Sequence, residues 1–257
     1  MAKHLLIVLT TLLLSASTSL AADSLSPRQV AQLTYDRELG DDMKMRGTME
    51  LISKNGHVRT REYISMRKDS EAKRSQLIRF TAPADIDGTA FLTIEKDFST
   101  NTEQHLYLPA LKRTRRIVAS QKGRSFVNSD FTYEDMQRHS VEAWDYQLAG
   151  EELVSEKSCY ILVSTPKEST DTQYSKTIAW IEKSHFIPLK IVFWDKKGNK
   201  SKVYQVVSFE MIDQVATETE VLMEDLTSGH KTRLKVLAIE YNTGLKDALF
   251  TARSLEG

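Results

Sequence analysis

The fold class is decided by the stretch MKMRGTMELISKNGHVRTREYISM, residues 43–66. In its first half, apolar residues alternate with charged or polar ones, which is the period of a half-buried antiparallel strand. The alternating apolar positions are Met43, Met45, Met49 and Leu51. Asn55-Gly56 comes next, and this dipeptide is the strongest short signal for a hairpin.

The returning strand of this hairpin is expected over about 57–68. Its alternation predicts an apolar face with Val58, Ile64 and Met66. The opposite, polar face would carry Arg59, Arg61 and Arg67.

The same alternation continues through most of the chain. Further strands are expected near 73–80, 90–96, 103–108, 112–118, 144–150, 158–165, 174–182, 187–195, 202–212, 216–225 and 231–241. Turn-forming residues separate them, and consecutive hairpins predict a large antiparallel meander with one apolar face. We therefore predict a mainly β protein with a single large curved antiparallel sheet. A sheet of so many strands must curl, split or close.

A curled sheet leaves a concave apolar face that needs a cover. One candidate is a short helix that starts at Ser26-Pro27, where serine can cap and proline is tolerated, and that ends at Gly40. The other candidate is the segment from about 119 to 142. Together they predict a half-open barrel covered by short helices.

The first residues indicate where the protein works. A basic start at Lys3 precedes the apolar run Leu5–Leu14, and small residues lead to a cleavage site after Ala21. This layout is typical of a secretory signal peptide, and the run is too short for a comfortable membrane anchor, which is the alternative. We predict a signal peptide at 1–21 and one domain at 22–257, located in the periplasm.

Composition gives little support to other classes. Residues 1–21 hold one of the 35 basic residues and none of the 35 acidic ones, which leaves 34 against 35 and gives no argument for nucleic-acid binding. Cys159 is the single cysteine, so no disulfide can form within the chain, and its apolar neighbours predict a buried, inert thiol.

No motif for catalysis or for a cofactor is recognisable. The chain has no Gly-x-Ser-x-Gly elbow, glycine-rich phosphate loop or His-Glu-x-x-His pair. Asp135 and His139 are four residues apart, but one such pair is weak evidence for a metal site. A hydrolase that uses Asp130, Glu134, Asp135 or His139 is the weakest of the hypotheses, and we expect no enzyme, cofactor or metal.

A basic strip comprises Lys112, Arg113, Arg115 and Arg116. Alternation places Arg113 and Arg115 on one face and the other two on the opposite face. The strip is either a solvated hairpin edge that charge protects from aggregation, or a rim that meets anionic headgroups or an acidic partner.

The segment SFVNSDFTYEDM (125–136) is expected to cover the concave face as a lid or plug. Ser129 or Asp130 could cap a short helix with Glu134 and Asp135 in its first turn. The acids could also pair with the basic strip. The apolar side of this lid comprises Phe126, Phe131, Tyr133 and Met136.

Three pieces in this order resemble a known family: RFTAPADIDGTAFL (79–92), LYLPALKRTRRI (106–117) and SFVNSDFTYEDM (125–136). Together with the leader, they resemble a divergent branch of the outer-membrane lipoprotein-sorting proteins of the LolA-like superfamily. The resemblance implies a half-open, strongly curved antiparallel sheet around an apolar cavity for acyl chains. The branch typically has glycine where Asn128 stands, and asparagine tolerates positive φ.

The expected function is that of a periplasmic carrier. It would bind acyl chains of lipoproteins or lipids and deliver them toward the outer membrane or to an exporter. The resemblance implies as partners an inner-membrane transporter of the resistance-nodulation-division type or an outer-membrane acceptor. The alternative is a periplasmic regulatory module of the RseB type that binds a partner protein.

The cavity wall is expected to come from the apolar positions of the strands, although a one-residue slip in register would invert a face, and ordinary core packing is the alternative for each residue. The wall candidates are Met45, Met49, Leu51, Ile64, Met66, Ile78, Phe80, Leu92, Trp144, Ile178, Trp180, Ile191 and Phe193.

Overall fold

The computed structural model describes residues 25–70, 73–96 and 102–256. The predicted signal peptide lies outside these residues. In the described part of the chain, no helix is long and apolar enough to cross a membrane.

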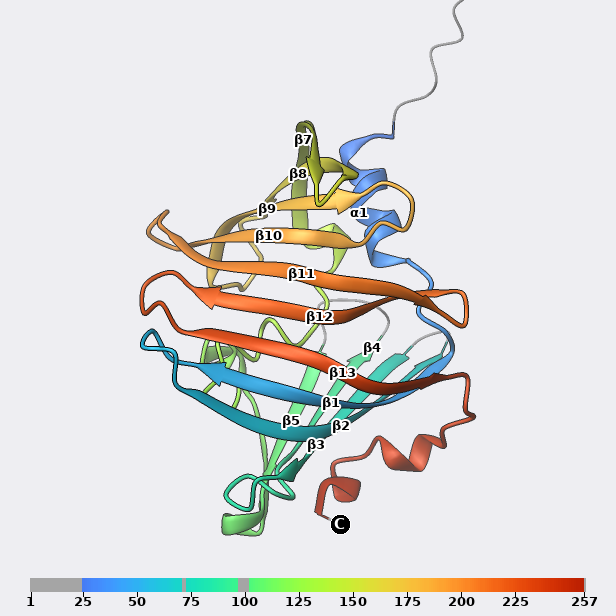
Figure 1. Ribbon diagram of the computed structural model, residues 1–257, viewed down its shortest axis with the longest axis vertical. Helices are drawn as coiled ribbons and strands as arrows, with labels where there is room; N and C mark the ends of the chain where they lie inside the picture. Colours follow the sequence, from blue (N-terminus) through green and yellow to red (C-terminus); the bar gives the residue numbers. More distant parts are fainter. Residues whose placement is uncertain (1–24, 71–72, 97–101, 257) are drawn as a thin grey trace, which may run out of the picture.

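Thirteen strands of the described residues form one antiparallel sheet (Figure 1). The strands are β1 (Asp42–Ile52), β2 (Val58–Ser70), β3 (Lys73–Ala82), β4 (Ala90–Lys96), β5 (Thr102–Leu108), β6 (Arg113–Arg116), β7 (Trp144–Val154), β8 (Lys157–Pro166), β9 (Tyr174–Glu182), β10 (Pro188–Asp195), β11 (Lys200–Ile212), β12 (Val215–Asp225) and β13 (Lys231–Tyr241). This confirms the predicted fold class, and each of the thirteen strands overlaps one of the stretches predicted from the sequence.

The order in the sheet is β6-β5-β4-β3-β2-β1-β13-β12-β11-β10-β9-β8-β7. Two meanders, β1–β6 and β7–β13, are therefore joined by the pairing of β1 with β13, in which Met43 lies opposite Tyr241. β6 and β7 are the two edges, and the described strands do not close into a barrel.

The hairpin between β1 and β2 forms as its sequence predicts. Gly56 has a φ of +82°, a conformation that glycine adopts without strain, and its N–H donates to the Ser53 carbonyl at 2.9 Å. Strand pairing then places Ile52 opposite Val58 and runs through to Asp42 opposite Lys68.

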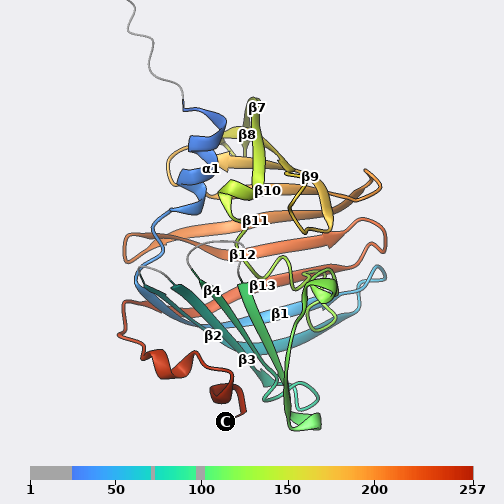
Figure 2. The ribbon, with the colours of Figure 1, turned by 180° about the vertical axis from the view of Figure 1, so that it is seen from behind.

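The sheet is strongly curved. In Figure 1 the strands of the second meander lie in front, and β3, β4 and β5 lie behind them. Seen from behind in Figure 2, the segment between β6 and β7 runs along the inner side of this curve. The main core cluster therefore contains side chains from both meanders together with Phe126, Phe131 and Tyr133 from that segment.

Helix α1 (Pro27–Tyr35) begins as predicted. The Ser26 hydroxyl accepts from the N–H of Gln29, and the Gln29 side chain accepts from the N–H of Ser26, which is a complete capping box. Val30 and Ala31 bury the inner face against β7 and β8. The helix ends at Tyr35 and not at Gly40, because Asp36 takes the cap position and Arg37 turns toward Glu218.

Two further covers differ from expectation. The helix expected after Ser129 does not form, and residues 125–136 are turns around a single bridge between Ser125 and Thr132. On the outer face, the C-terminal segment with η4 (Asp247–Leu249) and η5 (Arg253–Glu256) buries Phe250 and Leu255 against Leu77 and Leu92. The sequence analysis assigned no role to this segment.

Candidate functional site

The concave face collects eight of the thirteen wall candidates. Met49, Leu51, Ile78, Phe80, Trp144 and Phe193 are buried members of the main cluster, and Met45 and Ile191 pack against it half-buried. Whether these side chains contact an acyl chain stays a prediction. Their placement on a common face follows from the period of two in their strands.

The other five wall candidates lie on the convex side of the sheet. Met66 and Leu92 pack under the C-terminal segment, and Trp180 packs beside Cys159. Alternation along the strands places Ile64 with Met66, and Ile178 with Trp180. The convex face is itself covered in these places, so apolar residues occur on both faces and alternation alone does not identify the inner one.

Strand β2 shows why the inner and outer faces were predicted the wrong way round. Its inward residues include Arg61, Tyr63, Ser65 and Arg67, all buried, whereas Val58 is 53% exposed at the start of the strand. In the sequence, alternating arginines predict a solvent-exposed face even where the structure buries them on the concave side. Arg61 and Arg67 are therefore residues of the site that the sequence analysis missed, because it placed them on the polar side.

The segment Ile117–Met136, which we call the plug, fills much of the concavity. Phe126 is fully buried and lies 4.9 Å from Phe91 and 6.2 Å from Phe80, between ring centroids. Phe131 and Tyr133 are also buried, and Met136 packs against the same cluster. The four residues of the predicted lid thus contact the wall.

The acids of the plug bind the sheet and its loops, not the basic strip. The Asp130 carboxylate accepts from the Thr232 hydroxyl at 2.6 Å and lies 2.8 Å from Nδ1 of His230. Glu134 accepts from the Thr172 hydroxyl and from the N–H of Gln173 at 3.0 Å. The plug is therefore held at its base by polar contacts.

Asp135 provides a third anchor. It accepts from the Tyr174 hydroxyl at 2.6 Å and from Lys202 Nζ at 3.0 Å, and Lys202 is itself buried. Burial, together with the negative charge of Asp135, raises the pKa of Tyr174 well above its ordinary value. Tyr174 therefore remains a neutral donor to this carboxylate at physiological pH.

Arg61 holds the tip of the plug. Its Nη1 donates to the carbonyl oxygen of Val127. Val127 and Asn128 both have positive φ, +45° and +60°. Asparagine tolerates this conformation, as expected from its sequence position, but a β-branched valine is strained there. The hydrogen bond from Arg61 thus fixes a turn that its own sequence favours only in part.

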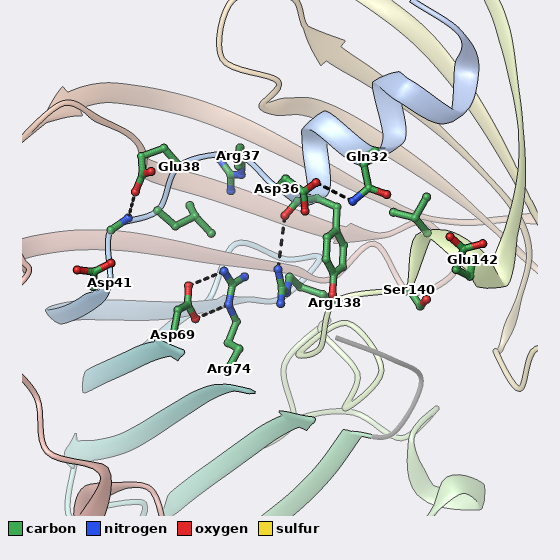
Figure 3. A pocket seen from close by; sticks show the side chains of 14 residues that line it. Gln32, Asp36, Arg37, Glu38, Asp41, Asp69, Arg74, Arg138, Ser140 and Glu142 are labelled. Carbon is green, nitrogen blue, oxygen red and sulfur yellow. Dashed lines mark hydrogen bonds and ion pairs between the residues drawn. The ribbon is translucent and has the colours of Figure 1, made fainter. Parts of the chain in front are cut away.

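Two adjoining cavities lie at the end of the concavity where β1 begins. The first, about 500 Å³, lies below the end of α1, and Figure 3 shows Asp69 hydrogen-bonded to Arg74 among its lining residues, with Arg138 nearby. The second, about 340 Å³, lies between the plug and strands β1, β2, β12 and β13. Arg37, Leu39, Arg74 and Arg138 line both cavities.

The second cavity has an apolar and a charged side. The apolar side chains are those of Met43, Met45, Phe131, Met136 and Ile239. The charged side consists of Arg37, Arg67, Arg74 and Arg138 with Glu95, Asp135 and Glu218. A cavity lined in this way can hold an apolar chain with a polar end.

The basic strip lies on the edge strand β6 and its preceding turn. Lys112, Arg113, Arg115 and Arg116 are exposed, and within the described ranges none of them forms an ion pair. Leu111 and Val118 flank the strip and are also exposed, by 67% and 50%. The strip is thus a cationic surface with apolar ends.

The described residues offer few features that suggest metal binding or a reactive thiol. No group of three or more histidine, cysteine or acidic residues that could hold a metal occurs in the described part of the chain. Cys159 is fully buried, and burial raises the pKa of its thiol. His139 packs edge-on against Trp144, with ring centroids 5.5 Å apart, instead of facing Asp135 as a ligand partner.

The chain is similar to a known family and to several solved structures. A family model described as "Uncharacterized protein" matches residues 72–257. A DUF1329 family protein from Desulfovibrio piger is 32% identical, with a TM-score of 0.84, over 89% of this chain and 97% of its own. No curated protein matches.

Two other solved structures are similar. A domain described as an outer membrane lipoprotein-sorting protein from Vibrio parahaemolyticus is 27% identical, with a TM-score of 0.83, over 90% of this chain and 98% of its own. A LolA superfamily protein from Nitrosomonas europaea is 20% identical, with a TM-score of 0.68, over 89% and 98%. The second likeness concerns the fold alone.

Proposed function

Because this chain belongs to the DUF1329 family and has the fold of the LolA superfamily, we propose that it is a periplasmic carrier of acylated molecules. In this role it shields acyl chains from water and passes them to a partner, without making or breaking a bond. The similar domain from Vibrio parahaemolyticus, described as lipoprotein-sorting, supports the same class of cargo.

The observation that carries the proposal is the amphipathic cavity between the plug and strands β1 and β13. Met43, Met45 and Met136 line its apolar side, and methionine is flexible and adapts to differently shaped chains. Burial of each methylene contributes about 0.8 kcal/mol, so even a few buried carbons supply useful affinity.

The plug is the part that must move for a longer chain to enter. Its aromatic side chains occupy the middle of the concavity, while its acids anchor its base. A chain that displaces Phe126 or Phe131 would replace one apolar contact by another. Such an exchange costs little in net hydrophobic free energy, because the apolar area that the acyl chain buries offsets the area that the displaced ring exposes.

The basic strip is the proposed docking surface for delivery. Its four exposed cations face solvent at one edge of the sheet, whereas the cavities lie beside α1 and the start of β1. An anionic membrane surface, or an acidic patch on an inner-membrane transporter of the resistance-nodulation-division type or on an outer-membrane acceptor, would attract it.

The test is native mass spectrometry of the protein purified from a bacterial periplasm, followed by lipid extraction. We expect a bound lipid or acylated peptide at near-stoichiometric occupancy, and uptake of a fluorescent fatty acid by the emptied protein. A clean protein mass together with no uptake of the probe would contradict the carrier function.

A matched pair of variants tests where the acyl chain binds. Met45→Trp adds bulk to the cavity wall and should weaken probe binding about tenfold, equal to ~1.4 kcal/mol. Met211→Trp makes the same change at a position that is 53% exposed, and should leave binding unchanged. Equal effects of the two variants would place the bound acyl chain outside this cavity.

A further inference from the structure

Arg37 has a buried donor with nothing to bind. It lies in the linker between α1 and β1, and its Nη2 donates to both oxygens of Glu218, at 2.8 and 3.1 Å. Its Nη1 is buried and has no hydrogen-bond partner within the described residues. A buried, charged donor without an acceptor is unfavourable, and native structures rarely retain one without a purpose.

Arg67 repeats this feature on β2. The residue is only 8% exposed, and its Nη2 donates to the carbonyl oxygens of Leu39 and Gly40. Its Nε is buried and also lacks a hydrogen-bond partner within the described part of the chain. The nearest carboxylate oxygen, on Asp69, is 3.6 Å away, and both oxygens of Asp69 already accept from Arg74 at 2.6 Å.

The arginines of the cavity lining already have acids beside them. Four arginines face three acids in the lining, and Asp69, which lines the adjoining cavity, pairs with Arg74 and lies 3.6 Å from Arg67. The three acids are occupied: Glu95 accepts from Arg138, Glu218 from Arg37, and Asp135 from Tyr174 and Lys202. Burial lowers the pKa of Arg67, the charge of Asp69 offsets this only in part, and the charges of Arg74 and Arg37 lower the pKa further.

Resting on the proposed carrier function, we infer that Arg37 and Arg67 bind the anionic head of an amphiphile whose acyl chain lies against Met43, Met45 and Met136. A carboxylate or phosphate offers several acceptor oxygens and matches the fork geometry of guanidinium groups. The cargo would thus be a lipid with an anionic head, selected over a neutral one by two arginines that each keep one buried donor nitrogen without an acceptor.

The test compares three twelve-carbon ligands by displacement of a fluorescent acyl probe: dodecanoate, dodecyl phosphate and dodecanol. The full protein should bind both anions at least about tenfold more tightly than the alcohol, because each charge-assisted hydrogen bond is worth roughly one decade or more in affinity. Arg67→Gln should remove most of this selectivity and leave dodecanol binding unchanged.

Two further variants control the result. Arg46→Gln removes a cation from the exposed face of the adjacent strand and should change nothing. Arg37→Lys keeps a charge for Glu218 but removes the free donor, and should lower selectivity in part. If Arg67→Gln does not fold, the selectivity of the unchanged protein and of Arg37→Lys still decides the question.

The contradicting outcomes are distinct. Equal binding of all three ligands would overturn the head-group site and leave the carrier function intact. Binding of none of them would count against both proposals. Displacement of dodecyl phosphate by inorganic phosphate at equal concentration would show a site for free anions, and would also overturn the inference.

Discussion

Single buried polar residues carry much of the specificity of this fold. Asp42, at the start of β1, is buried and accepts hydrogen bonds from the backbone N–H groups of Thr243, Gly244 and Leu245 and from the Thr243 hydroxyl. One carboxylate thereby ties the beginning of the first meander to the chain beyond the last strand. Burial alone would raise its pKa, but the hydrogen bonds together outweigh burial and lower it.

Asp42→Asn is therefore expected to destabilise the protein at pH 7 by about 1–3 kcal/mol, because an amide cannot accept as many strong hydrogen bonds. The direction in which this stability contribution changes with pH follows from the lowered pKa of Asp42. The contribution is complete above the unfolded-state pKa of ~3.9 and disappears as the pH falls through the folded-state value. Urea unfolding from pH 7 to pH 3 measures the difference, and a gap that widens toward acid would contradict this account.

Gly47 is required by close approach and not by its backbone conformation. A β-carbon there would lie 2.7 Å from the carbonyl oxygen of Lys235 and 2.9 Å from the ring of Tyr63. The register of β1 against β13 shifts between Arg46 and Gly47, so the two backbones meet closely at this point.

Gly47→Ala should destabilise the protein by about 1–3 kcal/mol, as overpacking does in other interiors. Gly123→Ala is the control, because a β-carbon there would meet only the Gln173 side chain at an ordinary 3.4 Å. Thermal unfolding of both variants measures the contrast. Similar melting temperatures for the two would show that the strands separate at low cost.

At the scale of elements, the plug is held by side chains at both its tip and its base. Arg61 contacts its tip through the carbonyl of Val127, while Asp130 and Asp135 bind its base to β13, β9 and β11. Burial lowers the pKa of Arg61, which nevertheless stays charged at physiological pH because an arginine titrates so far above it.

Arg61→Met should release the tip of the plug while its base stays bound. We expect a stability loss of about 1–3 kcal/mol, together with faster exchange of the amide protons of 125–129. Hydrogen exchange by mass spectrometry measures the second effect. Arg59→Met, at an exposed position on the same strand, is the control, and equal exchange in both variants would contradict a tether at Arg61.

The elements themselves were largely predictable from sequence. Alternation and turn residues located every strand, and β4, β9 and β13 have the predicted bounds. The faces of β2, β4 and β9 were not predictable. Leu92 and Trp180 are covered on the outside by the C-terminal segment and by neighbouring apolar residues, and a single strand does not reveal that cover.

The site was predictable in outline and not in chemistry. The aromatic side of the plug was recognisable in the sequence, and it contacts the wall. The inward arginines were not, because a buried cation looks like a solvated one until its partners are known. The only available signal was the interruption of apolar alternation by Arg61 and Arg67 in a strand otherwise long enough to be central.

At the scale of the molecule, the proposed cargo cavity and the proposed docking surface lie at different positions. The cavities lie beside α1 and the start of β1, whereas the basic strip lies on edge strand β6. Altering the strip should therefore change binding to surfaces and leave cargo affinity unchanged.

The triple variant Arg113→Gln, Arg115→Gln and Arg116→Gln should weaken binding to anionic vesicles by up to about 3 kcal/mol, at roughly 1 kcal/mol per cation. Added salt should reduce the difference, because exposed charges are screened. Vesicle sedimentation measures surface binding, and a fluorescent acyl probe measures cargo binding. Unchanged vesicle binding would assign the strip to protecting an edge strand from aggregation.

The pairing of β1 with β13 has a consequence for the order in which the protein forms. Each meander consists of neighbouring hairpins, whose strands pair over short sequence separations. Met43 and Tyr241, by contrast, are paired across nearly the whole length of the chain. Such distant contacts pay the largest loop-closure entropy and form slowly. Since both strands line the second cavity, the proposed binding site is complete only after this pairing, and a chain without β13 would lack one of its walls.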